Sequence, residues 1–227
     1  MPSFEGLLLD VGAVLVRTPF EMHRVAEARY GLPPGCLTWM GPYDPASDPL
    51  WRQLRAGQVS ELDYWRRRAE ETERRAGRAG GLQDYMAVCY GGPQAEFVRP
   101  EAEALVADAR AAGLRIGVLT NETELLQGRA WVERVDILQA VDACIDASLT
   151  GIMKPRPEAY RLALDALGLP PARVLFVDDQ PANVAGAEAV GIPAVPFDPT
   201  DVAASFTLLR RRLGLDLASV VVEDGSG

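Results

Sequence analysis

Short apolar runs recur along this chain, and segments with helical character separate them. Each run is too short for a helix and is dominated by aliphatic and β-branched residues, the pattern of a strand that is buried on both faces. Strands that alternate with helices in this way predict an α/β fold with a doubly wound parallel sheet. The predicted strands lie at 7–11, 114–119, 143–147, 174–177 and 194–196, with the segment at 143–147 the weakest.

The predicted helices fall into two groups. Five lie between or after the later strands, at 101–112, 124–135, 157–167, 181–190 and 201–213. The others fill a long segment, 18–93, which holds no convincing strand.

The segment 18–93 reads as a helical insertion behind the first strand. A capping box with proline at the first helical position is indicated by the spacing of Thr18, Pro19 and Glu21. A second helix is predicted to start at Ser60. Clusters of glycine and proline divide the segment into several helices. We therefore predict two domains, a core formed by 1–17 and 94–227 and a helical cap at 18–93.

Composition narrows the classes of function. The chain has 227 residues, of which 32 are acidic and 23 basic, giving a net charge of −9. Such a surface repels phosphate backbones and anionic lipid, so we expect neither nucleic acid nor membrane as a partner. The three cysteines are scattered, and the N-terminus lacks the basic and apolar regions of a signal peptide, so we expect a cytoplasmic protein.

Polar residues follow the predicted strands where each strand ends. In an open parallel sheet, ligands bind outside the carboxyl ends of the strands. Any one of these clusters alone is more simply a turn or a helix cap, but four of them in this order indicate a site. The residues are Asp10, Thr120 with Asn121, Lys154 in the loop after a predicted strand, and Asp178 with Asp179.

The residue types point to phosphoryl chemistry. Three carboxylates that meet at one edge repel one another unless a cation lies among them, and oxygen ligands without imidazole or thiolate favour Mg²⁺. Thr120 and Lys154 are then available for phosphate oxygens, and Asp10 for nucleophilic attack. Lys154 is the single lysine beside 22 arginines, which suggests a site that requires a compact ammonium.

Four motifs stand in order along the chain: 8–15 (LLDVGAVL), 118–121 (VLTN), 151–160 (GIMKPRPEAY) and 174–192. They resemble the four motifs of the haloacid-dehalogenase-like (HAD) hydrolase superfamily, with a Rossmann-like core, and the stretch 54–60 (LRAGQVS) is typical of its all-helical cap. The chain is similar to glucose-1-phosphate phosphatase-like and epoxide-hydrolase N-domain-like members.

The resemblance implies a phosphatase that acts on a small phosphorylated metabolite through an aspartyl-phosphate. It implies Asp10 as the nucleophile and Mg²⁺ held by Asp10, the carbonyl of Gly12 and Asp179, with Asp178 helping directly or through water. It further assigns the phosphoryl group to Thr120, Asn121 and Lys154, and the orientation of the acidic loop to Asn183.

One position departs from the family pattern. Phosphatases of the family usually carry a second aspartate, the general acid and base, two residues after the nucleophile, and here that residue is Gly12. Loss of a general acid and base costs about 10²–10⁴-fold in rate. We therefore expect a weak phosphatase, or one selective for good leaving groups. His23, the only histidine, is more simply a helix residue than a replacement acid.

Two alternatives remain at this point, and a third, the phosphonatase, is excluded in its usual form. A dehalogenase would use the same nucleophile without metal, which leaves the pair Asp178 and Asp179 without a purpose. A phosphonatase would need a cap lysine, and 18–93 contains none. A non-catalytic binding or regulatory protein would explain Gly12 but would not need the nucleophile. The sequence does not distinguish a monomer from a homodimer, nor does it identify the substrate.

Overall fold

A computed structural model describes residues 4–215. Its centre is a sheet of five parallel strands in the order β3-β2-β1-β4-β5, as the sequence predicts for a doubly wound α/β fold. The strands are β1 (Gly6–Leu9), β2 (Arg115–Thr120), β3 (Ala143–Asp146), β4 (Val174–Asp178) and β5 (Ala194–Pro196).

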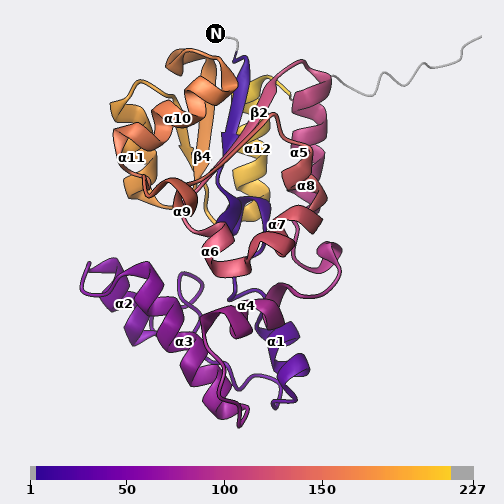
Figure 1. Ribbon diagram of the computed structural model, residues 1–227, viewed down its shortest axis with the longest axis vertical. Coiled ribbons are helices and arrows are strands. Elements are labelled where there is room, and N and C mark those ends of the chain that lie inside the picture. Colours follow the sequence, from indigo (N-terminus) through magenta and orange to yellow (C-terminus); the bar gives the residue numbers. More distant parts are fainter. Residues whose placement is uncertain (1–3, 216–227) are drawn as a thin grey trace, which may run out of the picture.

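Helices cover both faces of the sheet, which explains why the strands read as continuous apolar runs (Figure 1). Alternate residues of β1 enter different cores. Leu8 packs with the side of the sheet that α10 (Pro157–Leu167) and α11 (Pro181–Ala189) cover. Leu7 and Leu9 pack on the opposite side, under α5 (Pro100–Ala111) and α12 (Val202–Leu213).

The strand order reverses at β1, the central strand. The chain continues from β1 to β2 on one side, whereas β4 pairs with the other side, where Leu9 is in register with Val177. The backbone N–H of Asp10 donates to the carbonyl of Val177 at 3.0 Å. Side chains at the ends of β1 and β4 are therefore neighbours at a topological switch point, where sheets of this kind bind ligands.

The first four α-helices after β1 lie together beyond the carboxyl end of the sheet (Figure 1). Their bounds are α1 (His23–Tyr30), α2 (Pro49–Arg55), α3 (Glu61–Arg75) and α4 (Leu82–Tyr90). The glycine and proline clusters predict a division of the segment 18–93 into several helices, and Ser60 precedes α3 as the sequence predicts.

Aromatic side chains form the centre of this helical group. The ring of Phe20 lies 5.1 Å from that of Trp65, 5.6 Å from that of Trp51 and 5.8 Å from that of Trp39, measured between centroids. These aromatic residues are far apart in the sequence. Together they form a common apolar core for the four helices.

Two backbone contacts close the insertion at its base. Val16 and Val98 form an isolated antiparallel bridge. On either side of it, the N–H of Arg17 donates to Phe97 at 2.7 Å and the N–H of Arg99 donates to Leu15 at 2.9 Å. The start and the end of the insertion therefore leave the core side by side.

Two predicted helix bounds were wrong. The capping box forms, because the backbone N–H of Thr18 donates to Glu21 at 2.7 Å, but the regular helix begins only at His23. The predicted helix 124–135 is interrupted at Gly128, whose φ of 82° and ψ of 153° lie outside the helical region. In its place are α6 (Thr123–Gln127) and α7 (Arg129–Arg134), followed by α8 (Asp136–Gln139).

Among the described residues, no helix combines the length and the apolar character that crossing a membrane requires.

Candidate active site

Lys154 lies at the centre of the predicted cluster. Its Nζ donates to Oδ1 of Asp10 at 2.7 Å, to Oδ2 of Asp178 at 2.6 Å and to the carbonyl of Leu119 at 2.8 Å. The three hydrogens of the ammonium therefore bind acceptors at the ends of β1, β4 and β2. Burial alone would lower the pKa of Lys154, but the charges of Asp10 and Asp178 outweigh it and raise the pKa.

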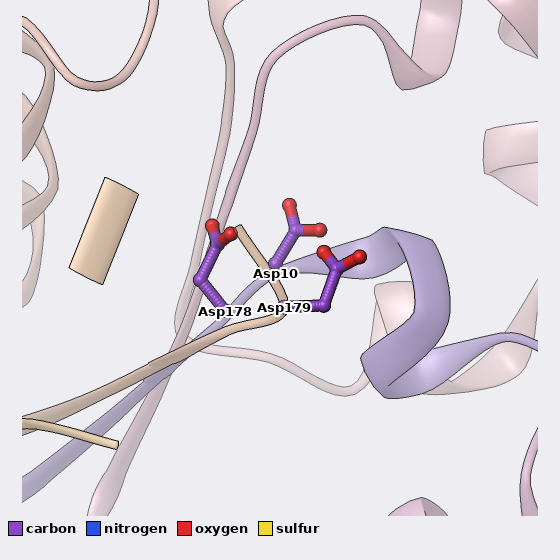
Figure 2. A group of neighbouring side chains, drawn as sticks. All are labelled: Asp10, Asp178 and Asp179. Atoms are coloured by element: carbon purple, nitrogen blue, oxygen red, sulfur yellow. The ribbon is translucent and has the colours of Figure 1, made fainter. Parts of the chain in front are cut away.

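Asp10, Asp178 and Asp179 form an acidic cluster at the switch point. One oxygen from each lies within 4.8 Å of the others, and the three carboxylates point to the same side (Figure 2). Two like charges at this separation repel by about 3 kcal/mol at an effective dielectric constant of about 20. Burial, reinforced by Asp178, raises the pKa of Asp10 to about 7, and burial also raises the pKa of Asp179.

Asp178 is fixed from several directions. Its Oδ1 accepts from the N–H of Gln180 at 2.9 Å, and the Nδ2 of Asn183 lies 3.0 and 3.1 Å from its two oxygens. The hydroxyl of Tyr160 in turn donates to the carbonyl of Asn183 at 2.7 Å. Oδ2 of Asp178 also accepts from Lys154, so Asp178 has little capacity left to accept further hydrogen bonds. Among the described residues, no comparable set of hydrogen-bond donors surrounds Asp179.

Asn121 and Thr120 lie at the end of β2 beside Lys154. The side-chain amide of Asn121 makes two bonds to the backbone of Lys154, accepting from its N–H at 2.8 Å and donating to its carbonyl at 3.2 Å. The hydroxyl of Thr120 lies 2.6 Å from that of Thr123. The sequence left open whether Thr120 and Asn121 cap the following helix, and neither makes such a bond.

Gly12 lies in a π-turn, Val11–Leu15, directly after Asp10. Its φ of −61° and ψ of 139° are open to any residue, and a Cβ placed there would meet only Oδ2 of Asp10, at 3.6 Å. Ala13 follows with a φ of 60°, a region that side chains rarely adopt. The buried Arg99 supports this turn through a 2.7 Å bond from Nε to the carbonyl of Ala13.

The cluster opens into a cavity of about 90 Å³. Its wall includes all of the predicted site residues except Asp178 and Asp179. Sequence reasoning missed several other lining residues because nothing in their local pattern distinguishes them from helix starts. The lining residues are Asp10, Gly12, Thr120, Asn121, Lys154 and Asn183, with Glu61, Glu122, Thr123, Leu126 and Gln180.

His23 lies elsewhere, in the aromatic core of the insertion. Its ring centroid is 4.2 Å from that of Trp39, and only 5% of the residue is exposed. Burial lowers its pKa to about 4, with smaller opposing and supporting effects of nearby charges. His23 is a packing residue, as the sequence favours, and it does not replace the missing acid.

The donor set fits Mg²⁺. The acidic cluster offers hard carboxylate oxygens, and no imidazole or thiolate lies among the residues that line the described cavity. Against the three carboxylates the structure places one ammonium, so the cluster carries excess negative charge when ionised. A divalent cation would relieve the repulsion that adds to burial in raising the pKa of Asp10 and Asp179.

The comparisons with known proteins identify the family of the chain. A family model for haloacid dehalogenase-like hydrolases matches residues 22–191. The phosphatase MT3486 of Mycobacterium tuberculosis is 36% identical over 115 residues, 51% of this chain and 50% of that protein. The (S)-2-haloacid dehalogenase 4A of Burkholderia cepacia is 27% identical over 204 residues, 84% of this chain and 78% of that protein.

The chain spans half or less of several curated relatives that it matches, including the phosphoserine phosphatase of Thermus thermophilus, which is 37% identical over 44% of this chain and 40% of that protein. Among solved structures, the HAD-hydrolase YfnB of Bacillus subtilis, described as bound to magnesium, aligns with a TM-score of 0.67 at 15% identity. That alignment covers 93% of this chain and 99% of that chain. At this identity the likeness shows the fold alone.

Proposed function

The chain belongs to the haloacid dehalogenase-like hydrolase family, and from this premise we propose that it is a Mg²⁺-dependent phosphatase of small phosphorylated metabolites. Asp10 is the nucleophile in this proposal, and an aspartyl-phosphate is the intermediate. The helices α1–α4 act as a cap over the cavity. Nucleic acid and membrane are not partners.

One observation carries the proposal: the carboxylate of Asp10 faces the cavity while Lys154 holds its Oδ1 at 2.7 Å. The ammonium fixes the direction of the carboxylate and leaves the second oxygen available for attack on phosphorus. Lys154 also lies where it can neutralise charge on the transferred phosphoryl group, which is the main requirement of this reaction.

The other residues take positioning roles. Thr120 offers its hydroxyl to a phosphoryl oxygen, and Asn121 holds the backbone of Lys154 in place through its two amide bonds. Asp10, the carbonyl of Gly12 and Asp179 would hold Mg²⁺, with Asp178 helping directly or through water while it stays bonded to Lys154 and Asn183. When bound, Mg²⁺ would neutralise the acidic cluster and withdraw charge from the phosphoryl oxygens.

Gly12 shapes the substrate preference. No side chain at this position can protonate a leaving oxygen, and an absent general acid costs about 3–5 kcal/mol of barrier. An ester with a stable leaving group loses least. We therefore expect faster hydrolysis of glucose 1-phosphate than of glycerol 1-phosphate, and equal rates would count against this preference.

Two other functions compete. Dehalogenation by the same nucleophile needs no metal, and it gives no reason for an aspartate triad whose oxygens lie within 4.8 Å of one another. A non-catalytic binding protein accounts for Gly12, but it gives no reason for a nucleophile held by a buried lysine. The phosphatase accounts both for the three clustered aspartates and for the nucleophile held by a buried lysine.

A single panel separates the three functions. Phosphate release from para-nitrophenyl phosphate and from a set of metabolite phosphates is measured with Mg²⁺ and with EDTA, for the wild type and for Asp10→Asn. Chloride release from (S)-2-chloropropionate is measured in parallel. The phosphatase predicts Mg²⁺-dependent phosphate release that Asp10→Asn abolishes. Metal-independent chloride release identifies a dehalogenase, and inactivity on every compound identifies a binding protein.

A further inference from the structure

The helical insertion sends one carboxylate into the cavity. Ser60 caps α3 by accepting from the N–H of Asp63 at 3.1 Å, which fixes the start of the helix and places Glu61 in its first turn. Glu61 lines the same cavity as Asp10 and Gly12. It therefore approaches the site from the cap, on the side opposite the sheet that carries the nucleophile.

A core residue holds Glu61 in this position. The Nε2 of Gln180 donates to Oε2 of Glu61 at 2.7 Å, and the backbone N–H of Gln180 donates to Asp178 at 2.9 Å. Two successive hydrogen bonds thus connect the cap carboxylate with the acidic cluster. The Glu61 residue is exposed, and its bond to Gln180 is what fixes the carboxylate at the cavity wall.

We propose that Glu61 is the general acid and base of the reaction, supplied by the cap in place of the side chain that Gly12 lacks. This inference rests on the proposed phosphatase function. In the first step, the carboxylic acid of Glu61 gives its proton to the ester oxygen as the bond from that oxygen to phosphorus breaks and Asp10 bonds to phosphorus. In the second step, Glu61 takes a proton from the water that attacks phosphorus, phosphate leaves Asp10, and Glu61 is protonated again.

The surroundings of Glu61 suit both steps. Desolvation in the cavity wall, with a contribution from the negative charge of Asp178, raises its pKa, while Gln180, Trp65 and Lys154 oppose the shift. A carboxyl group with a raised pKa is a better acid–base catalyst near neutral pH. The charged groups that face it are Asp178, Asp179 and Lys154 from the core and Glu122 beside β2.

Glu122 is a weaker candidate for this role. It lines the same cavity, but no hydrogen bond holds its side chain in the described structure, and it follows β2 rather than lying on the cap. Glu61 has the fixed position that proton transfer to one oxygen requires.

The test compares leaving groups. In Glu61→Gln, we expect kcat/KM for glycerol 1-phosphate to fall by about 10²-fold or more, whereas formation of the phosphoenzyme from para-nitrophenyl phosphate changes little, because its leaving group needs no proton. Para-nitrophenolate should then appear in a burst followed by slow turnover, since the second step has lost its base. The wild type should lose activity on glycerol 1-phosphate at high pH, as Glu61 ionises, and Glu61→Gln should lack this limb.

The matched control is Asp63→Asn, an exposed carboxylate in the same turn that does not line the cavity, and we expect wild-type kinetics from it. Equal losses on both substrates in Glu61→Gln, or no loss on either, would overturn the role of Glu61. The pH profiles of the wild type on the two substrates test the same role without any variant, and coincident profiles would overturn it. A wild type inactive on every phosphate ester would instead overturn the proposed function.

Discussion

The ammonium of Lys154 lies 2.7 Å from the carboxylate of Asp10, although 144 residues separate them in the chain. The pair is buried, and Asp178 is the second carboxylate on the same ammonium, at 2.6 Å. We expect Lys154→Met to lose at least about 10²-fold in kcat/KM because a preorganised cation leaves the phosphoryl site. We also expect it to unfold about 3–5 kcal/mol more easily at pH 7, since two buried carboxylates lose their counter-ion.

The stability part of this prediction has its own pH signature. Burial and the charge of Asp178 already raise the pKa of Asp10, and without Lys154 little opposes them, so the fold regains stability as pH falls and Asp10 becomes protonated. Denaturant unfolding at pH 7 and pH 5 measures it. Arg66→Met is the control, because its ion pair with Asp63 is exposed and 3.5 Å long. Equal destabilisation by the two substitutions would contradict a role for the buried pair.

Gly12→Asp should restore activity to Glu61→Gln. The backbone at this position has ordinary dihedral angles, and a Cβ there meets only Oδ2 of Asp10 at 3.6 Å, so the turn accepts a side chain. In the Glu61→Gln background, where no other acid remains, we expect kcat/KM for glycerol 1-phosphate to rise by at least about tenfold. In the wild type, where Glu61 already gives the proton, we expect a smaller change. Gly12→Ala controls for the added Cβ. A double variant as slow as Glu61→Gln alone would show that proton donation does not limit the reaction.

Asn183 should control the affinity for Mg²⁺ without touching the metal. Its Nδ2 bonds both oxygens of Asp178, and such supporting contacts are worth about 10–100-fold in metal affinity. Asn183→Ala should therefore need correspondingly more Mg²⁺ for half-maximal activity, and calorimetry with Mg²⁺ checks the shift directly. Tyr160→Phe removes only a hydrogen bond to the carbonyl of Asn183 and should change the Mg²⁺ requirement less. An unaltered Mg²⁺ requirement in folded Asn183→Ala would rule this role out.

The convergence of Asp10, Thr120 and Asp178 could be predicted from the sequence because it follows from one rule, whereas Lys154 lies in a loop beyond the helix Ala147–Thr150, which separates it from β3. Parallel strands end at the same edge of a sheet, so residues that follow apolar runs become neighbours whatever their separation. The strand order then puts the ends of β1 and β4 side by side.

Glu61 and Gln180 could not be predicted in the same way. Ser60 followed by Glu61 has the pattern of any helix start, and Gln180 precedes a proline that begins α11. Their contact depends on where the cap lies over the core, which no local pattern encodes. The division at Gly128 has a similar cause, since Trp131 and Arg134 both donate to the carbonyl of Tyr90 at the end of α4 and thereby set the direction of α7.

His23 should make the cap sensitive to acid. Burial lowers the pKa of His23 to about 4, below the usual value of about 6.5, so the folded chain resists a proton that the unfolded chain accepts. His23 therefore does not lower the free energy of unfolding above about pH 6.5, where it is neutral in both states. As pH falls from about 7 to 5, the free energy of unfolding decreases by about 2 kcal/mol, because only the unfolded chain takes up the proton. His23→Phe keeps the ring volume in contact with Trp39 and removes this titration. Denaturant unfolding at pH 7 and pH 5 should show the wild type losing about 2 kcal/mol more than His23→Phe over that interval, because the carboxylates titrate alike in both. Parallel losses would mean that His23 is protonated in the folded chain, and an NMR titration of this single histidine would then give a pKa near 6.5.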